Sequence, residues 1–195
     1  MNIPMEADSK TRAAEAFRIL NEFIGDLVSS TSNLELLDTA LFQQADIEVK
    51  RAYFRMCISY LMISLSKWCE FYEKYHSVIP RDVRIPAQKL KIAIEQRGII
   101  KFRNKVVGHI WDKELKRPLT IAEVQTRLIK IYGDSPEKFV LWINDSQKNT
   151  DHNTVVGIVE YVRDRIRQEF DLSENDIFPP ELIAELSKAK RTQSE

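Results

Sequence analysis

Glycine is scarce in this sequence, and the scarcity restricts the fold more than any other feature. Only 5 of the 195 residues are glycine, and the Asn-Gly and Asp-Gly pairs that close tight β-hairpins do not occur. Helix-start signals are frequent instead. Ser32 with Glu35, and Thr120 with Glu123, fit the capping box, in which each side chain satisfies an amide of the first turn. The sequence therefore predicts an all-α fold.

The spacing of apolar residues divides the chain into helices. They are expected near 9–29, 33–44, 46–76, 86–108, 120–132, 136–147, 154–171 and 180–190. The longest, 46–76, is apolar nearly all round in its middle, as is typical of a helix surrounded by others in a bundle. The turn-rich breaks are too short to link separate domains. We expect one helical-bundle domain over residues 9–190, with flexible tails at 1–8 and 191–195.

Composition and charge narrow the function classes. Lys plus Arg equals Asp plus Glu at 29 each, which argues against coating nucleic acid or anionic membrane by bulk charge. The most apolar segment, 53–65, contains Arg55 and is shorter than the roughly 20 residues of a membrane span. The N-terminal residues lack the basic and apolar regions of a secretory signal. These features predict a cytoplasmic protein.

Neither cysteine chemistry nor a cofactor is indicated. Cys57 and Cys69 lie twelve residues apart on one predicted helix, about 18 Å along its axis, so we expect them to pack in the core rather than pair. No two histidines have i, i+4 spacing, and there is no glycine-rich phosphate loop. His76 is expected to cap a helix end and His152 to be solvated. The sequence predicts no metal site and no cofactor.

The segment KFRNKVVGHIWDKE, residues 101–114, has an unusual distribution of polar residues. On a helical wheel the apolar residues Ile99, Ile100, Phe102, Val106, Val107 and Ile110 form one arc. Lys101 and Lys105 lie on the far side, where solvent is expected. Arg103 falls in the middle of the apolar arc. Because arginine stays charged, it needs a carboxylate, a phosphate or another chain facing it.

Asn104 and His109 lie near opposite edges of the same arc. On an unbroken helix, Arg103 and His109 are about 9 Å apart along the axis and about 120° apart around it, so they would not meet at one substrate atom. Gly108 could end the helix and let His109 turn back toward Arg103. Alternatively, a second copy across a two-fold axis could complete a composite groove.

The stretch RNKVVGH resembles the signature of the HEPN superfamily, in which an arginine, commonly followed by a polar residue, precedes a histidine by four to six intervening positions. Here these residues are Arg103, Asn104 and His109. The following IWDK resembles the abortive-infection and toxin-like branch, where an acidic residue, here Asp112, often trails the histidine. A related branch has a modifiable tyrosine at the position of Trp111, which lacks a hydroxyl. The resemblance implies a small helical bundle that commonly dimerises at the motif.

The resemblance further implies metal-independent RNA cleavage, in which the ribose 2′-hydroxyl attacks the adjacent phosphorus. His109 would be the general acid or base, because imidazole titrates near neutral pH. Arg103 would stabilise the charge that develops on the phosphate, and Asn104 would orient the phosphate or the histidine. Lys105, Trp111 and Asp112 are the expected substrate-binding residues. RNA, an antitoxin protein and a second copy of the chain are the implied partners.

Two other interpretations remain open. The same surface could belong to a non-enzymatic helical module that binds a partner protein or nucleic acid. Alternatively, Arg103 could be a structural residue paired with an internal carboxylate. Several further basic residues could rim an RNA groove together with Lys105, or simply be solvated; they are Lys101, Lys116, Arg117, Arg163, Arg165 and Arg167. Trp68 and Trp142 are expected to anchor the core or an interface.

Overall fold

The structure is a computed structural model that describes residues 3–107, 115–133 and 135–178, and its fold is all-α, as predicted. Its helices are α1 (Ile3–Glu35), α2 (Ala40–Gln43), α3 (Ile47–Tyr75), α4 (Arg81–Gln96), α5 (Ile99–Phe102), α6 (Ile121–Tyr132), α7 (Pro136–Ile143), α8 (Val155–Glu169) and α9 (Glu174–Ile177). Three short 3₁₀ turns join them: η1 (Leu36–Asp38), η2 (His76–Val78) and η4 (Asn149–Asp151). A π-helix, η3 (Arg103–Val107), continues directly from α5.

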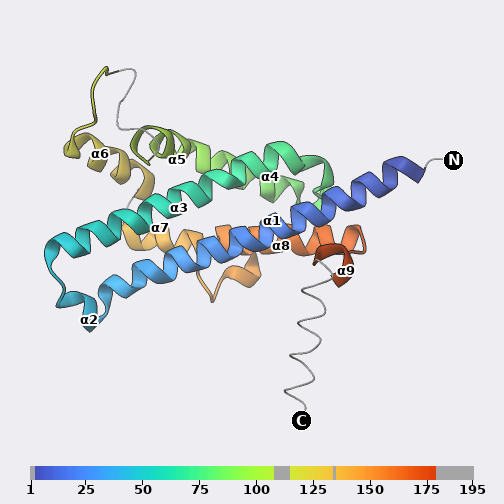
Figure 1. Ribbon diagram of the computed structural model, residues 1–195, viewed down its shortest axis with the longest axis horizontal. Helices are drawn as coiled ribbons and strands as arrows, with labels where there is room; N and C mark the ends of the chain where they lie inside the picture. The colour runs from blue at the N-terminus through green and yellow to red at the C-terminus, as the bar shows by residue number, and fades with distance from the viewer. Residues whose placement is uncertain (1–2, 108–114, 134, 179–195) are drawn as a thin grey trace, which may run out of the picture.

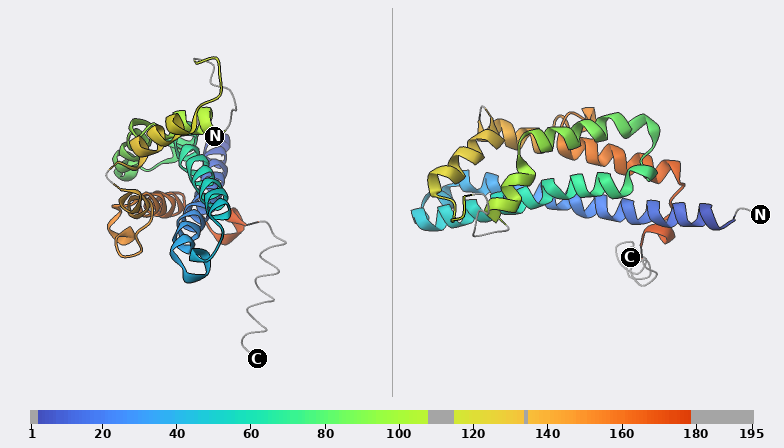
Figure 2. Two further views of the ribbon diagram at one scale, coloured as in Figure 1. Left: turned by 90° about the vertical axis from the view of Figure 1, so that its left-hand side faces the viewer. Right: turned by 90° about the horizontal axis from the view of Figure 1, so that it is seen from above.

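Two long antiparallel helices, α1 and α3, lie side by side and form the frame of the bundle (Figure 1). α8 packs along α1, and α4 lies against both α3 and α8. α6 and α7 lie toward the end of the bundle at which α3 begins, whereas α9 lies beside α1 toward the other end (Figures 1 and 2). The short α5 and the π-helix both contact α3.

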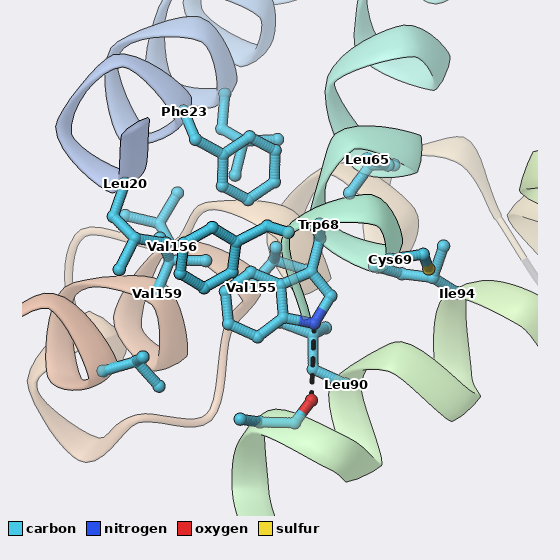
Figure 3. Close-up of a cluster of buried hydrophobic side chains, with 14 of the residues drawn as sticks. Leu20, Phe23, Leu65, Trp68, Cys69, Leu90, Ile94, Val155, Val156 and Val159 are labelled. Atoms are coloured by element: carbon cyan, nitrogen blue, oxygen red, sulfur yellow. Dashed lines mark hydrogen bonds between the residues drawn. The ribbon is translucent and has the colours of Figure 1, made fainter. Parts of the chain in front are cut away.

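The core is centred on Trp68, whose side chain is completely buried. Its ring stacks against Phe71, with the centroids 5.6 Å apart, and its indole Nε1 donates a hydrogen bond to the Ala87 carbonyl at 3.3 Å (Figure 3). Aliphatic side chains from α1, α3, α4 and α8 surround it. The expected core role of this tryptophan is confirmed. Cys57 and Cys69 are also buried and unpaired, as predicted.

Several predicted helix positions are confirmed. The predicted helix 46–76 is α3, which begins and ends within one residue of the expected limits. The helices expected at 120–132 and 154–171 are α6 and α8. The helix expected at 136–147 ends earlier, at Ile143, where Asn144 takes an extended conformation. The helix expected at 180–190 lies outside the described residues.

The prediction of separate helices at 9–29 and 33–44 is wrong. α1 runs without a break from Ile3 to Glu35, and it includes residues assigned to the N-terminal tail. The Ser32–Glu35 capping box does not form, because the apolar face continues through this region: Leu27, Thr31 and Leu34 are all buried. Within the helix, the Thr31 hydroxyl donates to the Leu27 carbonyl at 3.0 Å.

The prediction of one continuous helix over 86–108 is also wrong. The helix starts earlier, at Arg81, with Pro80 at its N-cap, and ends at Gln96. Gly98 then takes a left-handed conformation, with φ +76°. Glycine adopts this conformation without the Cβ clash that other residues suffer, so it ends α4 and redirects the chain into α5.

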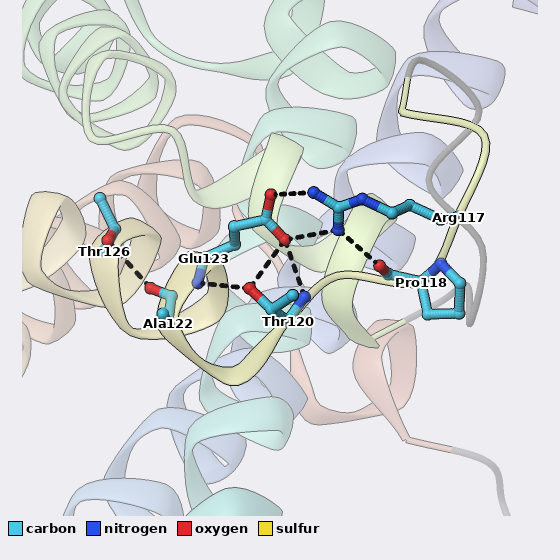
Figure 4. A network of polar contacts seen from close by, with 6 residues as sticks. All are labelled: Arg117, Pro118, Thr120, Ala122, Glu123 and Thr126. Atoms are coloured by element: carbon cyan, nitrogen blue, oxygen red, sulfur yellow. Dashed lines mark hydrogen bonds and ion pairs between the residues drawn. The ribbon is translucent and has the colours of Figure 1, made fainter.

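The capping box at Thr120 is confirmed (Figure 4). The Glu123 amide donates to Thr120 Oγ1 at 3.3 Å, and the Thr120 amide donates to the Glu123 carboxylate at 2.8 Å. Arg117 adds two further bonds to the same carboxylate, at 2.9 and 2.7 Å. These contacts lower the pKa of Glu123 to about 2, with the bond from Arg117 as the largest cause. The network fixes where α6 begins.

Candidate functional site

Arg103 begins the π-helix at the point where α5 ends. The preceding residues fix this segment to the bundle, because Ile99 and Phe102 are buried in the core. A π-helix is rare and is often found at functional sites. Arg103, expected in the middle of an apolar arc, keeps 40% of its side chain exposed. A long arginine side chain can lie along apolar surface and still reach water with its guanidinium.

Among the described residues, two side chains contact the Arg103 guanidinium. Its Nη1 donates to Asn104 Oδ1 at 2.9 Å, and its Nη2 lies 3.7 Å from Glu70 Oε1 on α3. The Glu70 side chain is 59% exposed. An ion pair of this length between exposed groups is screened by water and contributes little to stability. Arg103 is therefore neither buried against an internal carboxylate nor turned away from the protein.

Some of the remaining predicted site residues lie within the described part of the chain, and the others lie outside it. Asn104 is exposed beside Arg103 and shares a hydrogen bond with it. Lys101 is exposed as predicted, whereas Lys105 is half-buried rather than on the solvent side. Val106 and Val107 pack against the core, in agreement with the predicted apolar arc. His109, Trp111 and Asp112 lie outside the described residues, as does Gly108.

The basic residues of α8 do not join Arg103. Arg165 Nε bonds to Asp82 at 2.7 Å, in the first turn of α4. That turn is about 20 Å along α4 from its end at Gln96. Arg163 bonds to Asn21 on α1 at 3.1 Å, and Arg167 donates to the Leu172 carbonyl at 3.4 Å. These three arginines each bond to a neighbouring element of the bundle.

The histidines within the described residues have structural contacts. His76 Nδ1 lies 3.2 Å from the Glu73 carbonyl at the end of α3, as expected for a residue at a helix end. His152 is exposed, as predicted, but its ring stacks on Tyr161 with a centroid distance of 4.1 Å. In the part of the chain that the structure describes, no three His, Cys, Asp or Glu side chains are placed to hold a metal ion. Nor is any described helix long and apolar enough to cross a membrane.

The buried cysteines do not offer a nucleophile. Burial raises the pKa of the Cys69 thiol to about 12, with Glu95 adding a smaller contribution. Burial also raises the pKa of the Cys57 thiol. Because the thiolate is the reactive form, both groups are inert thiols at neutral pH.

Two features of this region have no signal in the sequence. Glu70 is an exposed residue of α3, and nothing in its spacing relates it to a residue 33 positions later. Arg97 ends α4 and contacts Trp142 on α7, with the guanidinium carbon 4.4 Å from the ring centroid. The first contact depends on how α3 packs against the π-helix, and the second on how the end of α4 packs against α7. Local sequence patterns do not encode that arrangement.

The comparisons with known proteins give a structural relative. No protein-family model matches the chain, and no curated protein matches it. The chain is similar to a solved structure from the mobile metagenome of V. paracholerae, the integron cassette protein Vpc_cass2. The two share 27% sequence identity with a TM-score of 0.64, over 79% of this chain and 95% of the other. Nearly the whole of that protein is thus similar to the helical bundle described above.

Proposed function

We propose that the protein is a metal-independent endoribonuclease of the HEPN type, acting in a defence or toxin–antitoxin system. The observation that carries the proposal is the placement of Arg103. A guanidinium at the surface of a π-helical turn is bonded to a neighbouring carboxamide, and its ion pair among the described residues is weak and screened. An incoming phosphate can displace such a pair, because arginine binds phosphate through two parallel hydrogen bonds.

The proposed reaction uses three residues of the RNKVVGH motif. A base removes the proton of the ribose 2′-hydroxyl, and the 2′-oxygen bonds to phosphorus as the bond to the 5′-oxygen breaks. An acid protonates the departing 5′-oxygen, so the products are a 2′,3′-cyclic phosphate and a free 5′-hydroxyl. His109 takes the acid or base role. Arg103 stabilises the negative charge on the phosphoryl oxygens, and Asn104 keeps the guanidinium oriented.

The mobile-element origin of the similar structure supports the proposed setting. That protein is carried on an integron cassette. We propose that the present chain likewise acts in the competition between mobile elements and their hosts, in the cytoplasm. An antitoxin protein would then be its natural regulator, and RNA its substrate.

We further propose that the chain forms a homodimer through α3. Val49, Met56, Ile63 and Glu70 recur every seven residues, so they lie along one side of that helix. Val49 and Met56 are more than half exposed, at 54% and 58%, although both are apolar. This stripe leads along α3 to Glu70, the residue that pairs with Arg103. A second copy packed on the stripe would cover it and bring the two Arg103 segments toward a shared groove.

Purified protein, RNA and EDTA test the nuclease directly. Cleavage should persist with the chelator and fall by about 10²- to 10³-fold in Arg103→Ala and His109→Ala. Arg103→Lys keeps the charge but loses the planar fork, so it should also be impaired. Lys89→Ala, which removes an exposed charge on α4, is the control and should cleave normally.

A substrate with one 2′-deoxynucleotide at the cleavage position tests the role of the hydroxyl. It should resist cleavage, because the nucleophile is absent. Cleavage that is unchanged in both motif variants would remove Arg103 and His109 from the reaction. Absence of cleavage by the wild-type protein, together with RNA or protein binding that is lost in the same variants, would favour the alternative of a non-enzymatic binding module.

A further inference from the structure

The direction of the Arg103 segment is determined at a two-residue junction between α4 and α5. The Arg97 amide donates to the Ala93 carbonyl at 3.2 Å, and the Gly98 amide to the Glu95 carbonyl at 2.9 Å. The next helical bond, from the Phe102 amide to the Gly98 carbonyl, already belongs to α5. Since Gly98 adopts a positive φ, the regular α-helical pattern is interrupted at this point. The two backbone bonds at the junction are fewer than those inside a helix, so contacts with other elements add to its stability.

Arg97 supplies one such contact, to the end of α6. Its Nη1 donates to the Ile131 carbonyl at 2.7 Å. Ile131 lies in the last turn of α6, where carbonyl groups lack partners within the helix and where a cation is favoured by the helix dipole. Gly133 ends α6 with φ +71°, so the chain turns away immediately after this contact. Arg97 thus acts as a cap for a helix that is 34 residues distant in sequence.

The same guanidinium also rests on the aromatic residues of α7. Its carbon lies 4.4 Å from the Trp142 ring centroid and 5.7 Å from that of Phe139. Burial lowers the pKa of Arg97, and within the described residues no carboxylate pairs with it. A carbonyl and two ring faces therefore stabilise its charge. A planar guanidinium can stack and donate at once, which a lysine ammonium cannot do.

From these contacts we infer that Arg97 is a positioning residue that fixes the direction of the Arg103 segment by clamping the α4–α5 junction onto α6 and α7. Its catalytic consequence rests on the nuclease proposed above, but the clamp itself does not. Arg103 follows only six residues after Arg97, with one short helix between them. Loosening the junction should displace Arg103 from a phosphate without removing any group that touches the substrate. A misplacement of about 1 Å in such a group can cost about 100-fold in rate.

Arg97→Lys is the principal test, and Arg84→Lys is its matched control. Arg84 also lies on α4 and also donates to a backbone carbonyl, that of Ile79 at 2.9 Å, but it is about 20 Å nearer the other end of the helix. Both variants exchange an arginine–carbonyl bond for a lysine. Amide hydrogen exchange over residues 99–107 is the direct measurement of the clamp, because local opening accelerates exchange. It should rise at least about tenfold in Arg97→Lys and remain at the wild-type rate in Arg84→Lys.

The kinetic measurement depends on nuclease activity. For RNA cleavage, Arg97→Lys should lower kcat by at least about tenfold while KM changes by less than about threefold. Trp142→Phe keeps an aromatic ring under Arg97, but a smaller one. It should also speed amide exchange over 99–107 and lower kcat, each by a smaller factor than Arg97→Lys does. Unchanged exchange over 99–107 in Arg97→Lys would overturn the inference. If the wild-type protein cleaves no RNA, the proposed function fails, and the exchange result alone decides whether Arg97 is a clamp.

Discussion

Glu70 Oε1 on α3 lies 3.7 Å from Arg103 Nη2 on the π-helix, although the two residues are 33 positions apart in the sequence. The pair sits at the surface, and its partners are 59% and 40% exposed. In the proposed enzyme, a substrate phosphate would compete with Glu70 for the same guanidinium. The proposed site would then include a carboxylate that lies outside the RNKVVGH motif.

Glu70→Gln should therefore improve substrate binding. Removing the negative charge abolishes the competition, and exposed ion pairs of this kind are worth about 0.2–1 kcal/mol, which corresponds to roughly a 1.4- to 5-fold decrease in KM for RNA. Stability should change little. Glu73→Gln is the control, because Glu73 pairs with Lys91 at 3.4 Å rather than with Arg103. A higher KM in Glu70→Gln would show that the carboxylate assists binding instead.

Met56→Glu should weaken the proposed dimer. A charge in the centre of the exposed α3 stripe would be buried without a partner if a second copy covered it. Light scattering coupled to gel filtration should show the wild type at twice the chain mass and the variant mainly at the single-chain mass. Ile85→Glu alters an equally exposed apolar residue on α4, so it should leave the assembly unchanged. A wild-type protein that runs as a monomer at high concentration contradicts the proposal.

Gly157→Ala should destabilise the fold. An added Cβ would lie 2.2 Å from the backbone oxygen of Asn149, too close for any atom, so α8 and the η4 turn would have to separate. Overpacking of this kind costs about 1–3 kcal/mol, which urea unfolding can measure. Gly25→Ala provides the contrast: nothing lies within 4 Å of its added Cβ, inside α1. That variant should be more stable by about 0.5–1 kcal/mol, because alanine favours helix.

The start of α6 should depend on pH through Glu123. Its pKa is lowered from 4.5 to about 2 by Arg117 and Thr120. A depressed carboxyl pKa gives stability that is present above the unfolded value near 4.5 and is lost as the pH falls through 2. The difference in urea midpoint between wild type and Glu123→Gln should be largest above pH 4.5 and shrink toward pH 2. Glu137→Gln, in the first turn of α7, should not show that trend.

The sequence predicted the helix class and the position of α3 because these depend on local periodicity and on the scarcity of glycine. The capping signal at Thr120 is confirmed for the same reason, because its side chain bonds an amide within its own first turn. Ser135 and Thr154 cap α7 and α8 in the same way. Ser32 carries the same signal, but it does not cap a helix, because α1 continues past it to Glu35. Burial of Thr31 and Leu34 keeps α1 intact, and tertiary packing outweighs a local preference of about 1 kcal/mol.

The candidate site was predicted only in part. Arg103 and Asn104 could be singled out from the sequence, since a charged residue in an apolar pattern needs a partner. Their environment could not be predicted, because it depends on Gly98 and on the π-helical turn. Glycine at position 98 is compatible with a helix interior as well as with a helix end. The helical wheel gives only the direction in which a side chain leaves the helix, so it could not show that the Arg103 side chain stays 40% exposed.

The π-helix also makes the length of this segment adjustable. A π turn closes its hydrogen bonds over one residue more than an α turn does, so it holds what is in effect a one-residue insertion between Arg103 and Val107. Deleting a single residue there would let the backbone relax to an ordinary α turn while α5 keeps its anchorage through Ile99 and Phe102. Related chains could thus lengthen or shorten the spacing between the arginine and whatever follows it by one residue, at little cost to the bundle. Spacing after this arginine is therefore a weaker guide to homology than the buried residues before it.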